Sequence, residues 1–316
     1  MMTLSIALVF QACGGDTLNS TAPNRDVATT EDVAPDASSS TGDTANSTDD
    51  STDSSMEKIA AEHKGDKPTP TPAAIAEPAV PVTGRSVTYA TIDGQPVTGY
   101  LAQPESVASD AESAPLPALI TIHEWWGLNE NIEALTRRLA GEGYTVLALD
   151  LYGDAIATNA QAARDYMRGV MDNPGPAQDN IFQAAEYLKA EFNAPAIGSI
   201  GWCFGGAWSL RTGLLLTSDL DALAIYYGQL LLAPEALDAL DMPIIGFFGE
   251  DDQSIAVDDV ENFESILNDL GKTADIHLYP GVGHAFANPS GQNYDAYAAE
   301  DAWEKTTAFF AEHLKG

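Results

Sequence analysis

One of the chain's two cysteines lies in a glycine-rich sequence that is typical of a nucleophile. Cys203 stands between Gly201 and Gly205, after an apolar run that predicts a strand and before a stretch that predicts a helix. This Gly-x-nucleophile-x-Gly pattern belongs to a turn so tight that the nucleophile takes a strained backbone conformation and its neighbours must be small. The helix points its N-terminus at the sulfur, which favours the thiolate. We therefore predict that Cys203 is a nucleophile rather than an ordinary buried cysteine.

An acid and a histidine follow Cys203 in the order that such a turn requires. Asp252 follows one predicted strand, and His284 follows the next strand after a glycine-rich turn. Asp252 would hold the imidazole in one tautomer, and His284 would move the proton. Glu250 and Asp251 remain alternative candidates for the acid.

The other titratable residues fit structural positions better. His123 precedes the nucleophile, His277 lies in a predicted strand, His313 lies in the last predicted helix, and His63 lies near the N-terminus. We expect these four histidines to be structural or exposed to solvent. Asp150 ends a predicted strand and is expected to organise the turn that follows.

The loop after the predicted strand Ala118–His123 supplies a further part of a hydrolase site. In this kind of site, one oxyanion N–H comes from the residue after the nucleophile and the second from that loop. The two groups are then the backbone amides of Phe204 and Trp125, and Glu124 would lie beside the thiol. Trp125 and Trp126 either line an acyl pocket or pack in the core, and both possibilities remain open.

Apolar runs alternate with amphipathic stretches from Arg85 onward, which predicts an α/β fold with a mostly parallel, doubly wound sheet and helices on both faces. Asp93-Gly94 marks a hairpin between the first two strands. The predicted strands are Val87–Ile92, Val97–Ala102, Ala118–His123, Thr145–Asp150, Ala196–Trp202, Ala222–Tyr227, Pro243–Phe248 and Ala274–Tyr279. The predicted helices are Asn131–Glu142, Ala160–Met171, Gln178–Phe192, Gly205–Leu216, Asp258–Leu270 and Ala296–Leu314.

The first part of the chain has a different composition. No aromatic residue occurs between Phe10 and Tyr89, and residues 16–55 consist almost entirely of Ser, Thr, Asp, Ala and Asn. Such a segment cannot bury enough apolar surface to offset its ordering entropy. We therefore expect a disordered tether over residues 14–84, with a short helix near residues 56–63, followed by one domain over residues 85–316.

Residues 1–13 resemble a bacterial lipoprotein signal. A short apolar run from Leu4 to Phe10 precedes Gln11-Ala12-Cys13. This pattern favours lipidation of Cys13 and an extracytoplasmic location, at the periplasmic or outer-membrane face. No basic residue precedes the apolar run, and a cytoplasmic protein is the alternative.

The charge of the chain excludes several classes of partner. The 47 acidic and 14 basic residues give a net charge of −33. Nucleic acids and anionic lipid surfaces select basic patches, so neither is an expected partner. No apolar run approaches the ~20 residues that a membrane-spanning helix needs. We expect a monomer that contacts a membrane only through a lipid anchor.

Four motifs together resemble the dienelactone hydrolase family of the α/β-hydrolase superfamily. They are Gly201-Trp-Cys-Phe-Gly-Gly206, His123-Glu-Trp-Trp-Gly-Leu-Asn129, Gly249-Glu-Asp-Asp252 and Gly283-His-Ala-Phe286. The resemblance covers residues 86–314. It implies an α/β-hydrolase fold and a Cys-His-Asp triad of Cys203, His284 and Asp252. It further implies that Glu124 contacts the resting thiol and helps to activate it.

One position departs from the family pattern. Members that act on anionic dienelactones carry an arginine four residues after the catalytic histidine, where this chain has Asn288. Arg164 and Arg168 lie on a neighbouring segment and do not clearly match the family's second arginine. The expected substrate-binding residues are Trp126, Tyr152, Arg164, Tyr166, Phe286 and Asn288.

These observations favour a thiol hydrolase of small esters or lactones that requires neither a metal nor an organic cofactor. One alternative is a surface-tethered binding or scaffold protein with a vestigial site. Another is a redox thiol protein, which the absence of a C-x-x-C motif or a resolving cysteine near Cys203 disfavours.

Lipidation of Cys13 can be tested directly. We expect protein from membrane fractions to begin at Cys13 and to carry the added mass of acyl chains. Intact-mass analysis measures both properties, with a Cys13→Ala variant as the control. An unmodified chain that retains Met1 in the cytosol would contradict the prediction.

Overall fold

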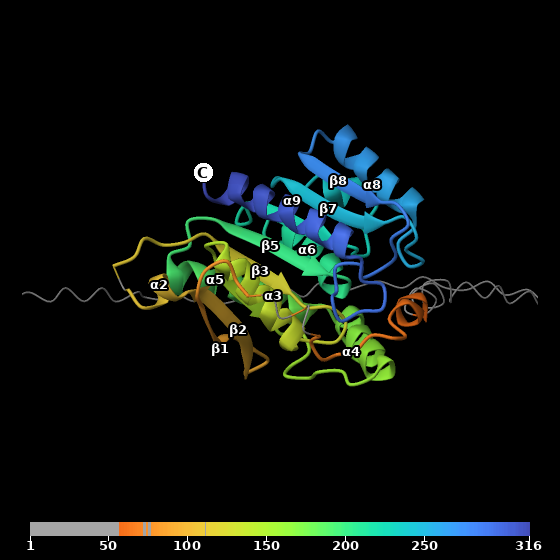
Figure 1. Ribbon diagram of the computed structural model, residues 1–316. Coiled ribbons are helices and arrows are strands. Elements are labelled where there is room, and N and C mark those ends of the chain that lie inside the picture. The colour runs from red at the N-terminus through yellow and green to blue at the C-terminus, as the bar shows by residue number, and fades with distance from the viewer. Residues whose placement is uncertain (1–56, 72–73, 75–76, 111) are drawn as a thin grey trace, which may run out of the picture. The chain divides into compact units, whose positions relative to one another are not determined.

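Strands and helices alternate along the chain as expected and form one mixed sheet with helices packed against it (Figure 1). The computed structural model describes residues 57–71, 74, 77–110 and 112–316. All of them belong to the unit Asn46–Gly316. The predicted signal segment, Cys13 and the first part of the predicted tether lie outside the described residues.

The sheet begins with an antiparallel hairpin. Strand β1 (Val82–Ile92) pairs with β2 (Gln95–Pro104), and the turn lies at Asp93 and Gly94. Both turn residues have positive φ values, 51° and 76°, as the right-handed twist of a two-residue hairpin favours. The hairpin predicted from Asp93-Gly94 is confirmed.

The remaining strands run parallel to one another. Their bounds are β3 (Ala118–Ile122), β4 (Thr145–Leu149), β5 (Ile197–Trp202), β6 (Ala222–Tyr226), β7 (Ile244–Gly249) and β8 (Ala274–Tyr279). In the described part of the chain the eight strands have the order β1-β2-β4-β3-β5-β6-β7-β8. Every residue of β3 to β7 is buried, which explains why their sequences are continuous apolar runs rather than alternating patterns.

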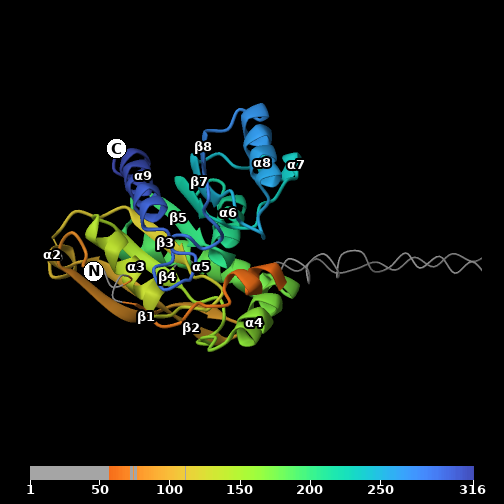
Figure 2. The ribbon, with the colours of Figure 1, turned by 45° about the vertical axis from the view of Figure 1, so that its right-hand side comes forward.

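Helices cover the sheet along its length. The longer ones are α3 (Glu130–Gly141), α4 (Ala160–Asp172), α5 (Gly175–Phe192), α6 (Phe204–Leu215), α8 (Val257–Asp269) and α9 (Ala296–Leu314). Short helical turns form α2 (Glu105–Ala108) and α7 (Pro234–Leu237). Figure 2 shows α8 and α9 on opposite sides of β7 and β8, which confirms a sheet covered on both faces. Within the described residues, none of the helices combines the length and the apolar character needed to cross a membrane.

Part of the predicted tether is structured. Residues 57–62 form the short helix that the sequence predicted, and residues 57–71 hydrogen-bond to loops of the domain. Strand β1 begins at Val82, so the boundary predicted between residues 84 and 85 falls inside a strand. The prediction of a disordered tether is therefore wrong for residues 64–71 and 82–84. The sequence concealed these contacts because the partners lie far along the chain.

A buried tyrosine joins the hairpin to the parallel part of the sheet. The hydroxyl of Tyr89 on β1 donates to Asn180 Oδ1 on α5 at 2.5 Å and accepts from the backbone N–H of Asp150 at 3.2 Å. Asn180 Nδ2 donates to the carbonyl of Asp150 at 2.8 Å. These hydrogen bonds hold the residue that follows β4.

We predict that Tyr89→Phe destabilises the protein. The change leaves Asn180 Oδ1 and the N–H of Asp150 buried without this partner, at a cost of about 1–3 kcal/mol. Urea unfolding followed by circular dichroism measures the free energy of unfolding. Tyr297→Phe is the control, because Tyr297 is 81% exposed. Equal destabilisation by the two variants would contradict the prediction.

Candidate active site

Cys203 occupies a strained turn between β5 and α6. Its φ is 56° and its ψ is −117°, a conformation that a residue with a side chain rarely adopts. A Cβ on Gly205 would lie 2.1 Å from the carbonyl oxygen of Ile122, which leaves no space for a larger residue. The strained turn predicted from the glycine spacing is present, and Cys203 is the N-cap of α6, whose first N–H groups lack intrahelical acceptors.

His284 and Asp252 form a buried pair. The Nδ1 of His284 lies 2.8 Å from Asp252 Oδ2, and both side chains are at most 1% exposed. Asp252 Oδ1 accepts from the backbone N–H groups of Ser254 and Ile255 at 2.7 and 2.9 Å, which fixes the carboxylate. This arrangement places the proton of the neutral imidazole on Nδ1 and leaves Nε2 free for the thiol.

Among the three candidate acids, Asp252 is the one that hydrogen-bonds to His284. Glu250 and Asp251 are exposed and lie outside the His284 hydrogen bond. A ring nitrogen of His284 lies within 4.8 Å of Cys203 Sγ. The structure therefore brings together the cysteine, the acid and the histidine that the chain order suggested.

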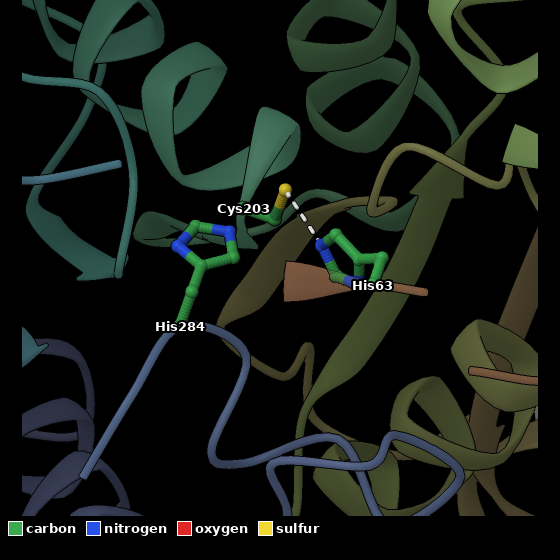
Figure 3. A group of neighbouring side chains, drawn as sticks. All are labelled: His63, Cys203 and His284. Carbon is green, nitrogen blue, oxygen red and sulfur yellow. Dashed lines mark hydrogen bonds between the residues drawn. The ribbon is translucent and has the colours of Figure 1, made fainter. Parts of the chain in front are cut away.

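His63 departs from expectation, because it lies against the thiol. Its Nε2 is 3.7 Å from Cys203 Sγ (Figure 3), and its Nδ1 is 2.5 Å from Asp66 Oδ2. The ring stacks on Trp125 with centroids 4.6 Å apart and meets the His284 ring edge-on at 5.3 Å. His63 is 2% exposed, so the expectation of an exposed or merely structural histidine near the N-terminus is wrong. The spacing of His63 and Asp66, one turn apart, is the signal that could have identified the pair.

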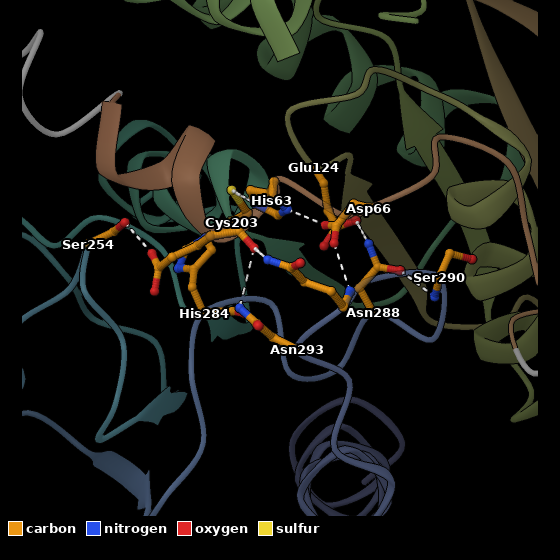
Figure 4. A network of polar contacts seen from close by, with 11 residues as sticks. His63, Asp66, Glu124, Cys203, Ser254, His284, Asn288, Ser290 and Asn293 are labelled. Atoms are coloured by element: carbon orange, nitrogen blue, oxygen red, sulfur yellow. Dashed lines mark hydrogen bonds and ion pairs between the residues drawn. The ribbon is translucent and has the colours of Figure 1, made fainter. Parts of the chain in front are cut away.

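Residues 57–71, which we call the covering segment, lie over the thiol. Cys203 is only 2% exposed beneath them. Polar contacts hold the segment to the loops after β7 and β8 (Figure 4) and to the loop after β3. These contacts include Glu62 with Gln253 and Ser254, Asp66 with Gln292, the Pro68 carbonyl with Asn129, and Thr71 with Pro289 and Ser290.

Glu124 is held by Asn288 rather than by the thiol. Asn288 Nδ2 donates to Glu124 Oε2 at 2.7 Å, and Asn288 Oδ1 accepts from the N–H of Ser290 at 2.9 Å. The hydrogen-bond partner of Cys203 Sγ in the described part of the chain is His63, where the family resemblance suggested Glu124. A cavity of about 10 Å³ borders Glu124 and Asn288, space for about one water molecule.

The two tryptophans of the loop after β3 are both buried. Trp125 and Trp126 are 0% and 3% exposed, and their rings lie 4.8 Å apart. Trp125 packs against the His63 ring, so it contributes to the covered site. The backbone amides of Phe204 and Trp125 remain predicted oxyanion donors.

The other expected substrate residues fall into two groups. Tyr152 lies beside Phe204, with ring centroids 5.4 Å apart, and Tyr166 on α4 contacts Tyr152 at 5.6 Å. Arg164 on the same helix donates to Gln161 at 2.9 Å. Phe286 is fully buried against the rings of Tyr227 and Tyr279, which is a core position.

His123 and Asp150 have the structural roles that the sequence suggested. His123 Nδ1 donates to the carbonyl of Glu124 at 2.6 Å, and its Nε2 accepts from the N–H of Leu151 at 3.2 Å. Asp150 accepts from the N–H groups of Tyr152 and Asp154 and so closes the turn after β4.

Opposite charges converge on the thiol. Burial raises the pKa of Cys203, but the charge of His284 and the hydrogen bond and charge of His63 outweigh burial and lower it to about 6. Burial lowers the pKa of His63, yet Asp66 and Cys203 raise it to about 9. Burial likewise opposes the charged form of His284, but Asp252 and the thiol raise its pKa well above 6.5. The site favours a thiolate between two imidazolium rings.

The environment of Glu124 favours its neutral form, whereas that of Cys203 favours the charged form. Burial raises its pKa to about 8, against the attraction of the His63 charge. A protonated Glu124 can donate a hydrogen bond at neutral pH, whereas an ionised one can only accept.

Comparisons with known proteins agree with the fold and the motifs. The model of the dienelactone hydrolase family matches residues 97–314. A putative carboxymethylenebutenolidase of Saccharolobus solfataricus is 30% identical over 254 residues, which cover 69% of this chain and 94% of that protein. A protein of Aquifex pyrophilus called usf is 31% identical over 229 residues, 70% of this chain and 96% of its own length.

A solved structure is similar over the same region. The crystal structure of a putative dienelactone hydrolase from Klebsiella pneumoniae has a TM-score of 0.65 and is 25% identical. It matches 73% of this chain and 99% of that one.

We predict that the alkylation rate of Cys203 depends on two properties, the fraction of the thiol that is ionised and the access that the covering segment allows. Since the thiolate is the reactive form, the rate with iodoacetamide should fall as pH drops through about 6 and level off above neutrality. An ordinary thiol would instead gain reactivity through pH 8–9, near its usual pKa of about 8.5. Peptide mapping by mass spectrometry identifies the modified cysteine.

Loosening the covering segment should speed this reaction. Glu62→Ala removes the acceptor of the Gln253 N–H and of the Ser254 hydroxyl. Losing charged hydrogen bonds of about 1.5–3 kcal/mol should raise the alkylation rate about tenfold or more. Glu57→Ala is the control, an exposed carboxylate on the same helix. Equal rates for both variants would show that the segment does not limit access.

Proposed function

The chain belongs to the dienelactone hydrolase family of ester and lactone hydrolases, and on that premise we propose that it cleaves small carboxylic esters or lactones with Cys203 as nucleophile. His284 acts as the general acid and base, and Asp252 orients it. The observation that carries this proposal is the placement of a thiol on a positive-φ turn, opposite a buried His284–Asp252 pair.

The first half of the reaction forms a thioester. The thiolate of Cys203 attacks the carbonyl carbon, and the carbonyl oxygen takes up the negative charge of the tetrahedral intermediate. The backbone N–H groups of Phe204 and Trp125 stabilise that oxygen. The intermediate collapses as the C–O bond breaks, and His284 gives its proton to the leaving alkoxide.

The second half releases the acid. His284, now neutral, takes a proton from water, and the resulting hydroxide attacks the thioester carbonyl. The second tetrahedral intermediate expels the Cys203 thiolate, and the His284 imidazolium remains beside it. The starting charges are thus restored, and no redox or metal chemistry enters the cycle.

Turnover requires the covering segment to move. An ester must approach within van der Waals contact of the sulfur, but His63 Nε2 stands 3.7 Å from Sγ. The segment is held by hydrogen bonds to polar loops, by the stacking of His63 on Trp125 and by the packing of Ile59 and Ala60 against the core. Water can replace the hydrogen bonds when the segment opens. We propose that substrate enters as residues 57–71 leave the thiol.

The two alternatives have less support. A scaffold protein would not need a thiol whose pKa is lowered by two imidazoles. A dithiol redox cycle needs a resolving cysteine, and the chain's other cysteine is Cys13.

We predict that Cys203→Ala abolishes hydrolysis of a short-chain chromogenic ester. Alanine offers no nucleophile at the turn, and His284→Ala should be nearly as damaging because the members of a triad act as a unit. Cys13→Ala, which removes the other thiol, is the matched control and should retain activity. More than a few per cent of wild-type kcat/KM in folded Cys203→Ala would overturn the nucleophile assignment.

We further propose that neutral substrates are preferred over carboxylated ones. Asn288 already donates one N–H to Glu124 and accepts from Ser290, and its amide carries no charge, so it can offer a substrate carboxylate only a neutral hydrogen bond from its second N–H. A carboxylate entering beside buried Glu124 would lose its hydration without a guanidinium at position 288 to receive it.

A matched pair of neutral and anionic lactones tests this preference. A charge-assisted contact contributes about 1.5–3 kcal/mol, so kcat/KM for the anionic lactone should be lower by about 10-fold to 100-fold. Measuring at low and high salt separates local contacts from the field of the acidic surface. Preference for the anionic lactone at both salt concentrations would point instead to a cation such as Arg164.

A further inference from the structure

Two histidine–carboxylate pairs converge on one thiol. His284 is paired with Asp252, and His63 is paired with Asp66, from opposite ends of the chain. Catalysis as proposed uses only the first pair. The second pair is equally buried, since the side chains of His63 and Asp66 are 0% and 2% exposed.

The three potential ligand atoms have the spacing of a metal site. One ring nitrogen of His63, one of His284 and the Sγ of Cys203 all lie within 4.8 Å of one another (Figure 3). In a tetrahedral zinc site, Zn–S is about 2.3 Å and Zn–N about 2.0–2.1 Å, so sulfur and nitrogen lie about 3.6 Å apart. The observed Sγ···Nε2 distance between Cys203 and His63 is 3.7 Å.

We propose that Cys203, His63 and His284 form a binding site for a thiophilic divalent cation, Zn²⁺ in the first instance. One thiolate and two imidazoles are donors of the kind that Zn²⁺ takes in proteins, whereas Mg²⁺ and Ca²⁺ take oxygen ligands. Three protein ligands leave the fourth tetrahedral position for water.

The free nitrogen of His284 is an independent indication of a ligand. Its Nε2 is buried and has no hydrogen-bond partner, although the residue is 1% exposed. A buried polar atom without a partner is costly, and a metal ion would satisfy it. His63 Nε2 has only the weak acceptor Cys203 Sγ as its partner.

Asp66 and Asp252 contact the two histidines on the ring nitrogen that faces away from the sulfur, as carboxylates beside metal-bound histidines do. Metal-bound histidines commonly donate their second N–H to a carboxylate, which orients the ring and raises its basicity. Asp66 and Asp252 occupy this position on His63 and His284, each through Nδ1. Both rings therefore present Nε2 to the space beside the sulfur.

The charge of the site does not oppose binding. A ring that carries a proton on Nε2 releases it to water as the nitrogen–metal bond forms, and the thiolate donates a lone pair directly. Each proton that leaves offsets one positive charge of the entering cation. No ligand changes its oxidation state.

Metal binding would close the site. The ion would coordinate the nucleophile Cys203 and the base His284 together. It would also tie His63, and with it the covering segment, to both residues. If Cys203 is the nucleophile, as proposed above, then Zn²⁺ is a reversible inhibitor of hydrolysis. Binding itself does not depend on that function.

Cobalt(II) titration of the full chain tests the site without relying on activity. In a Cys13→Ala background, Cys203 is the only thiol, so a thiolate-to-cobalt charge-transfer band reports coordination by its sulfur. We expect one Co²⁺ per chain, displaced by Zn²⁺. Calorimetry in buffers of different ionisation enthalpy should show that protons are released as the ion binds.

Two variants and a matched control locate the ligands. His63→Ala should weaken binding by more than about 100-fold, and Asp66→Asn by about 10-fold to 100-fold. The control is a His–Asp pair elsewhere, His277 and Asp275 on β8, which lie 3.1 Å apart. His277→Ala should bind Co²⁺ as tightly as the parent. Circular dichroism verifies that each variant is folded.

The outcomes separate this inference from the proposed function. A charge-transfer band lost in His63→Ala supports the metal site, even if no ester is hydrolysed. No band in the parent, or equal binding by folded His63→Ala, overturns the metal site even if hydrolysis is found. Hydrolysis that persists at saturating Zn²⁺ overturns the inhibitory role.

Discussion

The close packing of the turn around Cys203 is the constraint on which the site depends. α6 follows β5 without a connecting loop, and Gly205 lies so near the carbonyl of Ile122 that no side chain fits. This close packing holds Cys203 at a positive φ, a strained backbone conformation for a residue with a side chain. The same turn places the sulfur at the N-terminus of α6, where the unbonded N–H groups favour a thiolate.

The parallel sheet then assembles the remaining groups. The strands β3, β5, β7 and β8 end at one edge, so the loops that follow them meet there although they are distant in the chain. Burial of ionisable groups at this edge is tolerated because most of them are paired. Asp252 accepts from two backbone N–H groups as well as from His284, and Glu124 accepts from Asn288.

The covering segment couples this edge to the N-terminal part of the chain. It brings His63 and Asp66 to the thiol, and few apolar side chains, Ile59 and Ala60 among them, join its hydrogen bonds to the domain, whose net free energies are modest. A segment held in this way can open without unfolding the sheet. Opening of the segment would admit an ester to Cys203. A metal ion bound to His63, Cys203 and His284 would hold the segment closed, so substrate entry would depend on whether the metal is bound.

The sequence by itself determined the elements and the local motifs. The apolar runs of the central strands, the hairpin at Asp93-Gly94 and the glycine-flanked turn at Cys203 depend on neighbouring residues, so they can be read without a structure. The order of Cys203, Asp252 and His284 was informative because parallel strands end at a common edge.

Only the tertiary structure decided which distant side chains meet. His63 lies 140 residues before Cys203, and Asn288 lies 164 residues after Glu124. No local pattern encodes such pairs, because the backbone between them sets the distance. A polar segment near the N-terminus predicted a tether, but hydrogen bonds from Glu62 and Asp66 to loops at the far end of the chain hold it on the thiol.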